Sequence, residues 1–185
     1  MIVLIIGPSG SGKGTQAELL AKSFGLATIS MGDLLRQEID TRSELGQKVA
    51  TYLAAGKWVP AELTWEILKE KLNRQKGGFV LDGFPRLVEQ LIMLEEYLKL
   101  KQQQIDKVVY LQVSEAEAIK RLLGRSRNDD KREVIEQRLR SFQETIEPIL
   151  ARVKQQGILA EVDGDRSIQA IHQDIVARLR KRCLN

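Results

Sequence analysis

The sequence is poor in the residues and segments that mark several classes of protein. Its only cysteine is Cys183, which cannot form a disulfide within the chain and therefore fits a reducing compartment. The apolar run at residues 1–6 is too short to span a bilayer and has no basic region before it, so we expect neither a signal peptide nor a membrane partner. These features together favour a cytoplasmic protein.

Aromatic residues are scarce as well, at 5% of the chain. Nucleic-acid-binding surfaces usually combine dense stripes of basic residues with aromatic side chains, whereas the basic residues here are spread along the sequence. We therefore expect no nucleic-acid partner. The formal net charge of +4 fits either an ordinary solvated surface or a small ligand rich in phosphate, such as a nucleotide.

What the sequence does contain is typical of a soluble α/β domain. Its 185 residues, of which 43% are hydrophobic and 29% charged, fit one globular domain spanning residues 1–185. Short runs rich in Val, Ile and Leu predict buried strands, and longer segments with helical periodicity separate them. The strand candidates are residues 2–6, 27–30, 79–82, 107–113 and 158–163. This alternation predicts a parallel sheet of these five strands flanked by helices, with ligands at the carboxyl ends of the strands.

A glycine-rich loop directly follows the first predicted strand, with the sequence Gly7-Pro8-Ser9-Gly10-Ser11-Gly12-Lys13-Gly14-Thr15. In a P-loop, glycines let backbone N–H groups turn inward around phosphate oxygens, and the next helix N-terminus adds partial positive charge. Lys13 can then reach the β- and γ-phosphates of a nucleotide. The general pattern places Ser or Thr directly after the lysine, whereas here Gly14 intervenes before Thr15. The loop predicts a phosphate-binding site but does not identify the group that accepts the phosphate.

The longer string from Gly10 to Gln16 resembles the adenylate kinase family, in which Gly-Thr-Gln follows the lysine. Further segments resemble the same family in the same order. They are residues 29–36 (ISMGDLLR), 56–60 (GKWVP) and 82–86 (DGFPR), followed by a lid region with Arg121, Arg125, Arg127, Asp129, Asp130 and Arg138. The likeness covers roughly residues 2–166. It implies a three-layer P-loop NTPase fold with a helical acceptor-binding insertion at residues 30–59 and a short lid at residues 125–131.

The resemblance implies an enzyme that reversibly transfers a phosphoryl group from MgATP to AMP, giving two ADP. AMP carries a largely dianionic phosphate at about pH 7, so its oxygen is already a nucleophile and no general base is needed. The lone histidine, His172, is accordingly expected to be a surface or packing residue. The reaction does need charge neutralisation, in-line positioning and exclusion of water. Two alternatives stay open: a UMP/CMP kinase on the same fold, and a nucleotide-binding module without turnover.

The resemblance also assigns roles to individual residues. The catalytic residues would be Lys13, Arg86, Arg121, Arg125, Arg127 and Arg138. The ATP site would comprise Gly10, Ser11, Gly12, Lys13, Gly14, Thr15, Arg125 and Arg166. The AMP site would comprise Met31, Arg36, Lys57, Trp58, Val59, Gly83, Phe84, Pro85, Arg86, Gln90, Arg127 and Arg138. Asp33 and Asp82 would hold Mg²⁺ through its water shell, and the family expectation is a monomer.

Two departures from the family pattern affect this interpretation. Met31 stands where adenylate kinases typically have threonine and UMP/CMP kinases have alanine, and methionine cannot donate a hydroxyl hydrogen bond. Gln90 favours AMP, because adenylate kinases place a glutamine there and an amide can pair bidentately with an adenine edge. The lid is also very short, since only Ser126 separates Arg125 from Arg127. The segment has neither the length nor the cysteines for a zinc site, so no structural zinc is expected.

Overall fold

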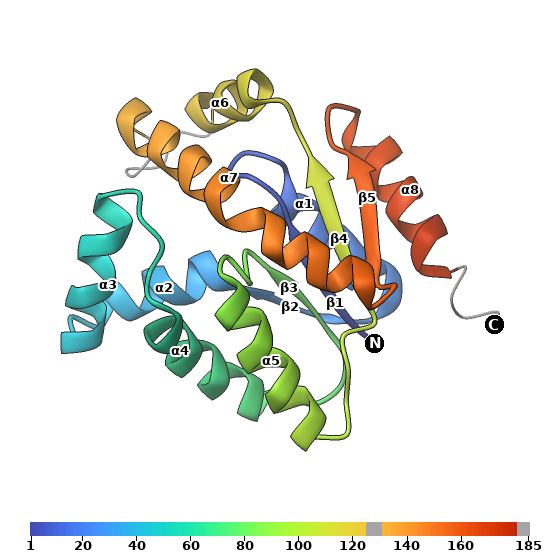
Figure 1. Ribbon diagram of the computed structural model, residues 1–185, viewed down its shortest axis with the longest axis horizontal. Coiled ribbons are helices and arrows are strands. Elements are labelled where there is room, and N and C mark those ends of the chain that lie inside the picture. The colour runs from blue at the N-terminus through green and yellow to red at the C-terminus, as the bar shows by residue number, and fades with distance from the viewer. Residues whose placement is uncertain (125–130, 181–185) are drawn as a thin grey trace.

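The computed structural model describes residues 1–124 and 131–180. Its centre is a sheet of five parallel strands in the order β2-β3-β1-β4-β5 (Figure 1). The strands are β1 (Ile2–Ile6), β2 (Ala27–Ser30), β3 (Phe79–Asp82), β4 (Lys107–Gln112) and β5 (Leu159–Asp163). The predicted five-stranded parallel sheet is therefore confirmed, and only β4 and β5 differ from the expected ranges, each by a single residue at one end.

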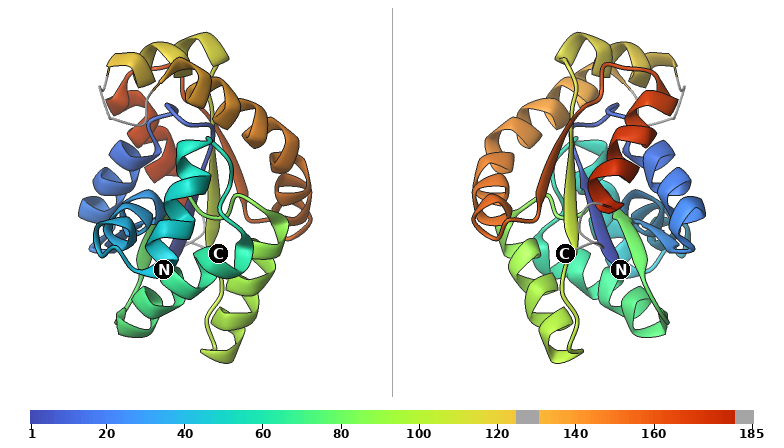
Figure 2. Two further views of the ribbon diagram at one scale, coloured as in Figure 1. Left: turned by 90° about the vertical axis from the view of Figure 1, so that its left-hand side faces the viewer. Right: turned by 90° about the vertical axis from the view of Figure 1, so that its right-hand side faces the viewer.

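Helices lie between the strands and after the last strand, and they flank both faces of the sheet. They are α1 (Lys13–Phe24), α2 (Met31–Asp40), α3 (Glu44–Ala54), α4 (Ala61–Arg74), α5 (Val88–Leu100), α6 (Glu115–Gly124), α7 (Arg132–Gln155) and α8 (Ile168–Arg180). α1 and α8 lie on one face, whereas α5 and α7 lie on the other (Figure 2). This is the three-layer arrangement that the fold class predicts.

The strands are apolar throughout because each is packed on both sides. On β1, Leu4 and its neighbours two residues away face the core formed with α5 and α7, whereas Val3 and Ile5 face α1 and α8. Every residue of β1 is at most 3% exposed. Successive side chains of a strand point to opposite faces, so burial of both faces removes the polar alternation of a half-exposed strand. Each such side chain contributes roughly 1.5–3 kcal/mol of burial free energy.

The strand register brings the loops of the site together. Asp82, the last residue of β3, is paired with Ser30 at the end of β2 and with Ile5 near the end of β1. The glycine-rich loop, the start of α2 and residues 83–87 therefore leave the sheet at the same edge. This edge is the one at which parallel α/β sheets bind ligands.

The chain between β2 and β3 is helical, and α2 and α3 lie within residues 30–59, the expected acceptor-binding segment. Ser30 caps α2 by accepting a hydrogen bond from the Asp33 amide, and Ser43 caps α3 by accepting one from the Gly46 amide at 2.8 Å. The expected lid falls almost entirely outside the described residues, which resume at Lys131, the residue before α7. Within residues 1–124 and 131–180, no helix combines the length and the apolar character needed to cross a membrane.

Candidate functional site

The glycine-rich loop between β1 and α1 takes a shape that other residues would oppose. Gly10 and Gly12 have φ angles of 84° and 86°, in the left-handed region that glycine adopts without steric cost. A Cβ atom at Gly10 would lie 2.4 Å from the carbonyl oxygen of Ala118 in α6. Gly12 caps α1 and, as a glycine, has no side chain to bond to the first N–H groups of the helix. The first N–H groups of α1 are therefore suited to an anionic ligand.

Lys13 lies over this loop. Its ammonium donates hydrogen bonds to the carbonyl oxygen of Pro8 at 2.7 Å and to the hydroxyl of Ser11 at 3.3 Å. The side chain is only 7% exposed, yet it lines a cavity. A buried ammonium that faces a cavity beside a helix N-terminus favours an anion at that place.

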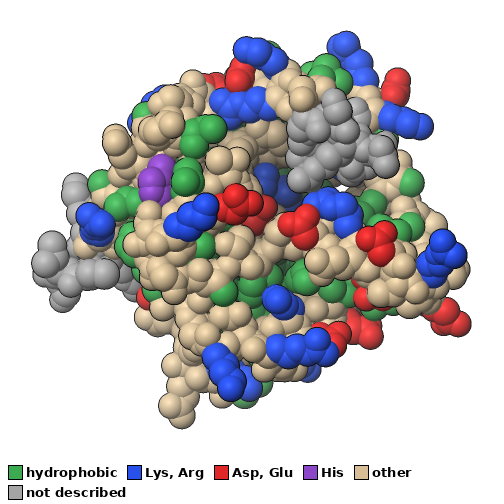
Figure 3. Space-filling model, turned by 180° about the vertical axis from the view of Figure 1, so that it is seen from behind, with side chains coloured by type: hydrophobic (Ala, Val, Ile, Leu, Met, Phe, Trp, Pro, Cys, Tyr) green, Lys and Arg blue, Asp and Glu red, His purple; other side chains and the backbone are tan. Residues whose placement is uncertain are grey.

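The cavity has a volume of about 770 Å³ and follows the carboxyl edge of the sheet. Among the described residues, its wall carries seven Lys or Arg side chains and three Asp or Glu side chains. A space-filling view from behind shows a hollow with basic side chains inside it and acidic side chains at its margin (Figure 3). The surplus of positive charge suits a ligand with several phosphates.

Most of the predicted site residues lie on the wall of this one cavity. They are Gly10, Ser11, Gly12, Lys13, Gly14, Thr15, Met31, Asp33, Arg36, Lys57, Trp58, Val59, Asp82, Gly83, Phe84, Arg86, Gln90, Arg121, Arg138 and Arg166. Pro85 is buried, forms a cis peptide bond with Phe84, and is not part of the wall. Arg125 and Arg127 lie outside the described residues.

Arg86 connects two segments that form the cavity wall. Its Nε donates to the carbonyl oxygen of Gly83 at 3.2 Å and its Nη1 to that of Gly7 at 3.1 Å, so it joins the end of β3 to the glycine-rich loop. The guanidinium also lies 4.8 Å from the ring centroid of Trp58. Burial lowers the pKa of Arg86 to about 10, while Asp82 acts to raise this pKa and Arg138 acts to lower it. Arg86 therefore stays charged at neutral pH, and an anion beside it and Arg138 would relieve their repulsion.

Asp82 has the features of a carboxylate that serves a cation. Its Oδ1 is buried and has no hydrogen-bond partner among the described residues. Its Oδ2 faces the start of α1, since a Cβ atom at Gly14 would lie 3.4 Å from it. A buried carboxylate oxygen is costly unless a cation or a donor compensates it, and Mg²⁺ prefers oxygen ligands. Residues 1–124 and 131–180 contain no cluster of three metal-ligating side chains, so Mg²⁺ here would also need water and phosphate oxygens.

Asp33, the second predicted metal residue, has a partner that the sequence analysis did not foresee. Its carboxylate forms an ion pair with Arg36 one turn later in α2, and both side chains are partly exposed. The two residues were expected to serve different ligands, the metal and the acceptor phosphate. In this structure they form one unit on the cavity wall.

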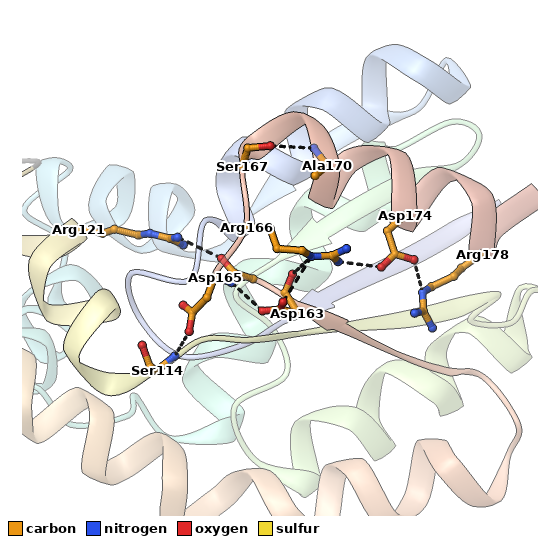
Figure 4. Close-up of polar contacts among 10 residues, drawn as sticks. Ser114, Arg121, Asp163, Asp165, Arg166, Ser167, Ala170, Asp174 and Arg178 are labelled. Carbon is orange, nitrogen blue, oxygen red and sulfur yellow. Dashed lines mark hydrogen bonds and ion pairs between the residues drawn. The ribbon is translucent and has the colours of Figure 1, made fainter.

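Two arginines of the site hold the loop between β5 and α8 in place, and Arg166 is itself part of this loop (Figure 4). Arg121 of α6 bonds to Glu117 at 2.8 Å and to the carbonyl oxygen of Gly164 at 3.0 Å. The hydrogen bond from Arg121 is the main reason that the pKa of Glu117 lies below its usual value. Arg166 donates to Asp174 of α8 at 2.7 Å. The loop is thus held from both sides, by α6 and by α8.

Gln90 has a structural role in addition to the one that the sequence suggested. Its Oε1 accepts hydrogen bonds from the backbone N–H groups of Arg86 at 2.7 Å and Leu87 at 3.3 Å, at the start of α5. Its Nε2 donates to the hydroxyl of Thr64 at 2.8 Å. The expected bidentate pairing with a base needs both the oxygen and the nitrogen, and here the oxygen is already used by the backbone.

Thr64 is a wall residue that the sequence analysis missed. It lies on α4 at the position four residues before Leu68, and both residues are buried. A polar residue within a buried apolar stripe was the available signal, because such a residue needs a specific hydrogen-bond partner.

The glycine-rich loop between a buried strand and a helix, facing a cavity lined with arginines, defines a P-loop enzyme of the class that handles nucleotide phosphates. Comparison with known sequences narrows this class. The family model for adenylate kinase matches residues 5–158. The chain therefore belongs to the adenylate kinase family.

Individual relatives agree with the family model. An adenylate kinase of Corynebacterium urealyticum is 39% identical over 183 residues, which cover 98% of this chain and 100% of that protein. One of Prochlorococcus marinus (strain MIT 9303) is 41% identical over 169 residues, covering 91% and 93%. One of Mycolicibacterium smegmatis is 44% identical over 152 residues, covering 81% and 84%. These matches confirm the predicted family, fold and adenylate kinase activity.

Proposed function

We propose that the enzyme transfers the γ-phosphoryl group of ATP reversibly to the phosphate of AMP, giving two ADP. The observation that carries this proposal is the position of Arg86, which lies beside Arg138 and bonds to Gly7 of the glycine-rich loop. An acceptor phosphate bound by these two arginines would therefore lie next to a donor phosphate bound by the loop. The reaction requires that proximity, because the two phosphates repel each other in water.

On the donor side, the loop and the start of α1 bind the ATP phosphates. Phosphate oxygens accept stronger hydrogen bonds than the carbonyl oxygen of Pro8, so Lys13 would exchange that contact for the phosphates and follow the transferred charge. Arg121 would neutralise further phosphate charge, and Arg166 would line the part of the site that holds the donor base. The resemblance adds Arg125 and Arg127, whose roles stay predictions.

On the acceptor side, Arg36, Arg86 and Arg138 hold the phosphate of AMP. Planar guanidinium groups suit this task because they bind phosphate oxygens in bidentate fashion. An oxygen of the AMP phosphate attacks the γ-phosphorus, and the bond from that phosphorus to the β–γ bridging oxygen breaks. ADP leaves with the electron pair of this bond. No proton has to move, because the attacking phosphate is dianionic and the leaving oxygen becomes part of a phosphate.

The remaining wall residues complete the proposal. Gln90 and Met31 would contact the base of AMP, with Lys57, Trp58 and Val59 on the same wall. Mg²⁺, when bound, neutralises part of the charge on the β- and γ-phosphates. Asp82 and Asp33 would hold it through water, which suits the buried oxygen of Asp82. The monomeric state, the cytoplasmic location and the absence of zinc stay predictions.

The test is a panel of acceptors. Purified enzyme is supplied with ATP, Mg²⁺ and one nucleoside monophosphate at a time, and nucleoside diphosphate formation is measured by chromatography. We expect AMP to have the highest kcat/KM and to yield two ADP for each AMP consumed. A higher kcat/KM with UMP or CMP would overturn the assignment of the acceptor. Lys13→Met should abolish turnover while leaving the thermal unfolding temperature near that of the parent enzyme.

A further inference from the structure

Two buried polar side chains meet at the wall of the cavity. Thr64 of α4 is 4% exposed and Gln90 of α5 is 1% exposed, and both line the cavity. A buried donor or acceptor that loses its partner is costly, so a direct hydrogen bond between two such groups fixes both of them. The contact joins two helices and orients a side chain that lines the cavity.

The polarity of this contact is set by the backbone. Two N–H groups, those of Arg86 and Leu87, point at one end of the Gln90 amide, and only its oxygen can accept from them. The NH₂ end must therefore face Thr64. The Thr64 hydroxyl in turn donates toward the carbonyl oxygens of Ala61 at 2.9 Å and Pro60 at 3.1 Å, which leaves a lone pair for Gln90.

We propose that Thr64 is a positioning residue for acceptor selection, because its hydroxyl accepts one hydrogen of the Gln90 amide and so fixes the direction of the other toward the base. The amide nitrogen carries two hydrogens, and Thr64 takes one of them. The second is the one that a ligand can receive. This inference rests on the proposed function, since it takes Gln90 to contact the base of AMP.

An N–H donor from Gln90 favours bases whose facing ring nitrogen carries no hydrogen and can accept a hydrogen bond. Adenine offers ring nitrogens that carry no hydrogen and can accept from Gln90. Uracil (N3–H) and guanine (N1–H) instead carry a hydrogen on the corresponding ring nitrogen. Two N–H donors would then face each other, which is unfavourable where binding excludes water. Cytosine has an unprotonated N3, so this contact discriminates against UMP and GMP more than against CMP.

Thr64→Val tests the inference because valine has nearly the same shape and cannot accept a hydrogen bond. We expect KM for AMP to rise about fivefold to tenfold, the equivalent of one hydrogen bond, with KM for ATP unchanged. The preference for AMP over GMP should fall about fivefold, because the backbone still fixes which end of the amide is the donor, but the second amide hydrogen is no longer directed at the base. Thr64→Ser keeps the hydroxyl and should retain both parental values.

Matched variants separate this effect from a loss of folding. Thr51→Val makes the same change at an exposed position of α3, where the hydroxyl donates a hydrogen bond to the carbonyl oxygen of Lys48, and should leave all constants unchanged. If Thr64→Val does not fold, Thr64→Ala removes the hydroxyl without adding a methyl group in its place. Equal rises of KM for ATP and AMP, or an unchanged AMP-to-GMP preference, would overturn the positioning role.

Gln90→Leu separates the assumption that Gln90 contacts the base of AMP from the inference that Thr64 positions Gln90. If it leaves KM for AMP unchanged, Gln90 does not contact the base, and the underlying assignment fails together with the inference. If Gln90→Leu weakens AMP binding and Thr64→Val does not, the contact between Gln90 and the base stands and only the positioning role of Thr64 is wrong. Combining Thr64→Val with Gln90→Leu should cause little further loss of AMP binding beyond Gln90→Leu alone, because both changes remove the same contact.

Discussion

Asp174 of α8 holds Arg166 at the edge of the cavity: its Oδ2 accepts a hydrogen bond from Nη2 of Arg166 at 2.7 Å. Its other oxygen accepts from Nε of Arg178 at 2.6 Å (Figure 4). One carboxylate therefore bridges two arginines, of which only Arg166 lines the cavity. A planar guanidinium fixed in this way loses less conformational entropy when a ligand binds than a mobile one.

This contact predicts a selective effect on the donor substrate. Asp174→Asn removes the charge that holds Arg166, so we expect KM for ATP to rise about twofold to fivefold, in the range of a partly exposed ion pair. KM for AMP should stay within error of the parent value. Steady-state kinetics with each substrate varied in turn measures both constants.

The control for this prediction is Arg178→Gln, which removes the other arginine and keeps the contact between Asp174 and Arg166. It should leave KM for ATP unchanged. Equal increases of both KM values in Asp174→Asn would contradict a local effect on the donor site.

The same carboxylate predicts a pH dependence of stability. Hydrogen bonds from Arg178 and Arg166 hold the pKa of Asp174 below its ordinary value. A carboxyl with a lowered folded-state pKa stabilises the protein above the unfolded-state pKa, about 3.9 for aspartate, and this contribution is lost as the pH falls further. The difference in unfolding free energy between the parent enzyme and Asp174→Asn should be constant from pH 7 to 5 and shrink below about pH 4. Urea unfolding at several pH values measures it, and a difference that grows on acidification would contradict the lowered pKa.

Arg86→Lys tests whether the planar guanidinium of Arg86, with its several N–H donors, matters in addition to its charge. A lysine keeps the positive charge but cannot hold the carbonyl oxygens of both Gly83 and Gly7 while presenting donors to a phosphate. We expect kcat to fall about 10²-fold, as for the loss of a donor that stabilises transition-state charge. KM for ATP should change little. The matched control is Arg74→Lys, at an exposed arginine near the end of α4 that pairs with Glu70. A near-normal kcat in Arg86→Lys would show that charge alone is enough.

The sequence was sufficient to predict the strands because strands buried on both faces consist almost entirely of apolar residues. All residues of β1 are apolar because the strand is covered on both faces, and the glycines after it signal a backbone that other residues cannot adopt. The composition of the strands does not indicate their order in the sheet, β2-β3-β1-β4-β5. This order depends on how helices far apart in the sequence pack on the sheet, which single-strand patterns do not encode.

The site was predictable where its residues follow a motif, and less so where it depends on contacts between elements. Lys13 was predicted from the glycine-rich loop after the first predicted strand, and Asp82 from the segment at residues 82–86 that resembles the family; both lie on the cavity wall. The bond between Thr64 and Gln90 joins two helices, and spacing along the chain does not reveal such a pair. The ion pair of Asp33 with Arg36 is different, because positions three apart on a helix are neighbours and the pair could have been expected.

Met31 bears on acceptor selection in a way that the structure makes specific. It is the first residue of α2, is buried, and lies on the cavity wall near Gly83. Met31→Thr should change the preference for AMP over UMP by no more than about 1–2 kcal/mol, roughly one hydrogen bond. The measurement is the ratio of kcat/KM for the two acceptors in both enzymes. A larger change would make Met31 the main selector in place of Gln90.

Asp82→Asn tests the carboxylate that faces the start of α1. Asparagine has the same shape but lacks the charge that would attract Mg²⁺ and its water shell. We expect the Mg²⁺ concentration for half-maximal activity to rise about tenfold, and chelation of the metal to abolish activity in both enzymes. The matched control is Asp40→Asn, at an exposed aspartate that ends α2, which should leave the Mg²⁺ dependence unchanged. An unchanged Mg²⁺ dependence in Asp82→Asn would mean that the buried oxygen serves Arg86 alone, whose pKa it raises.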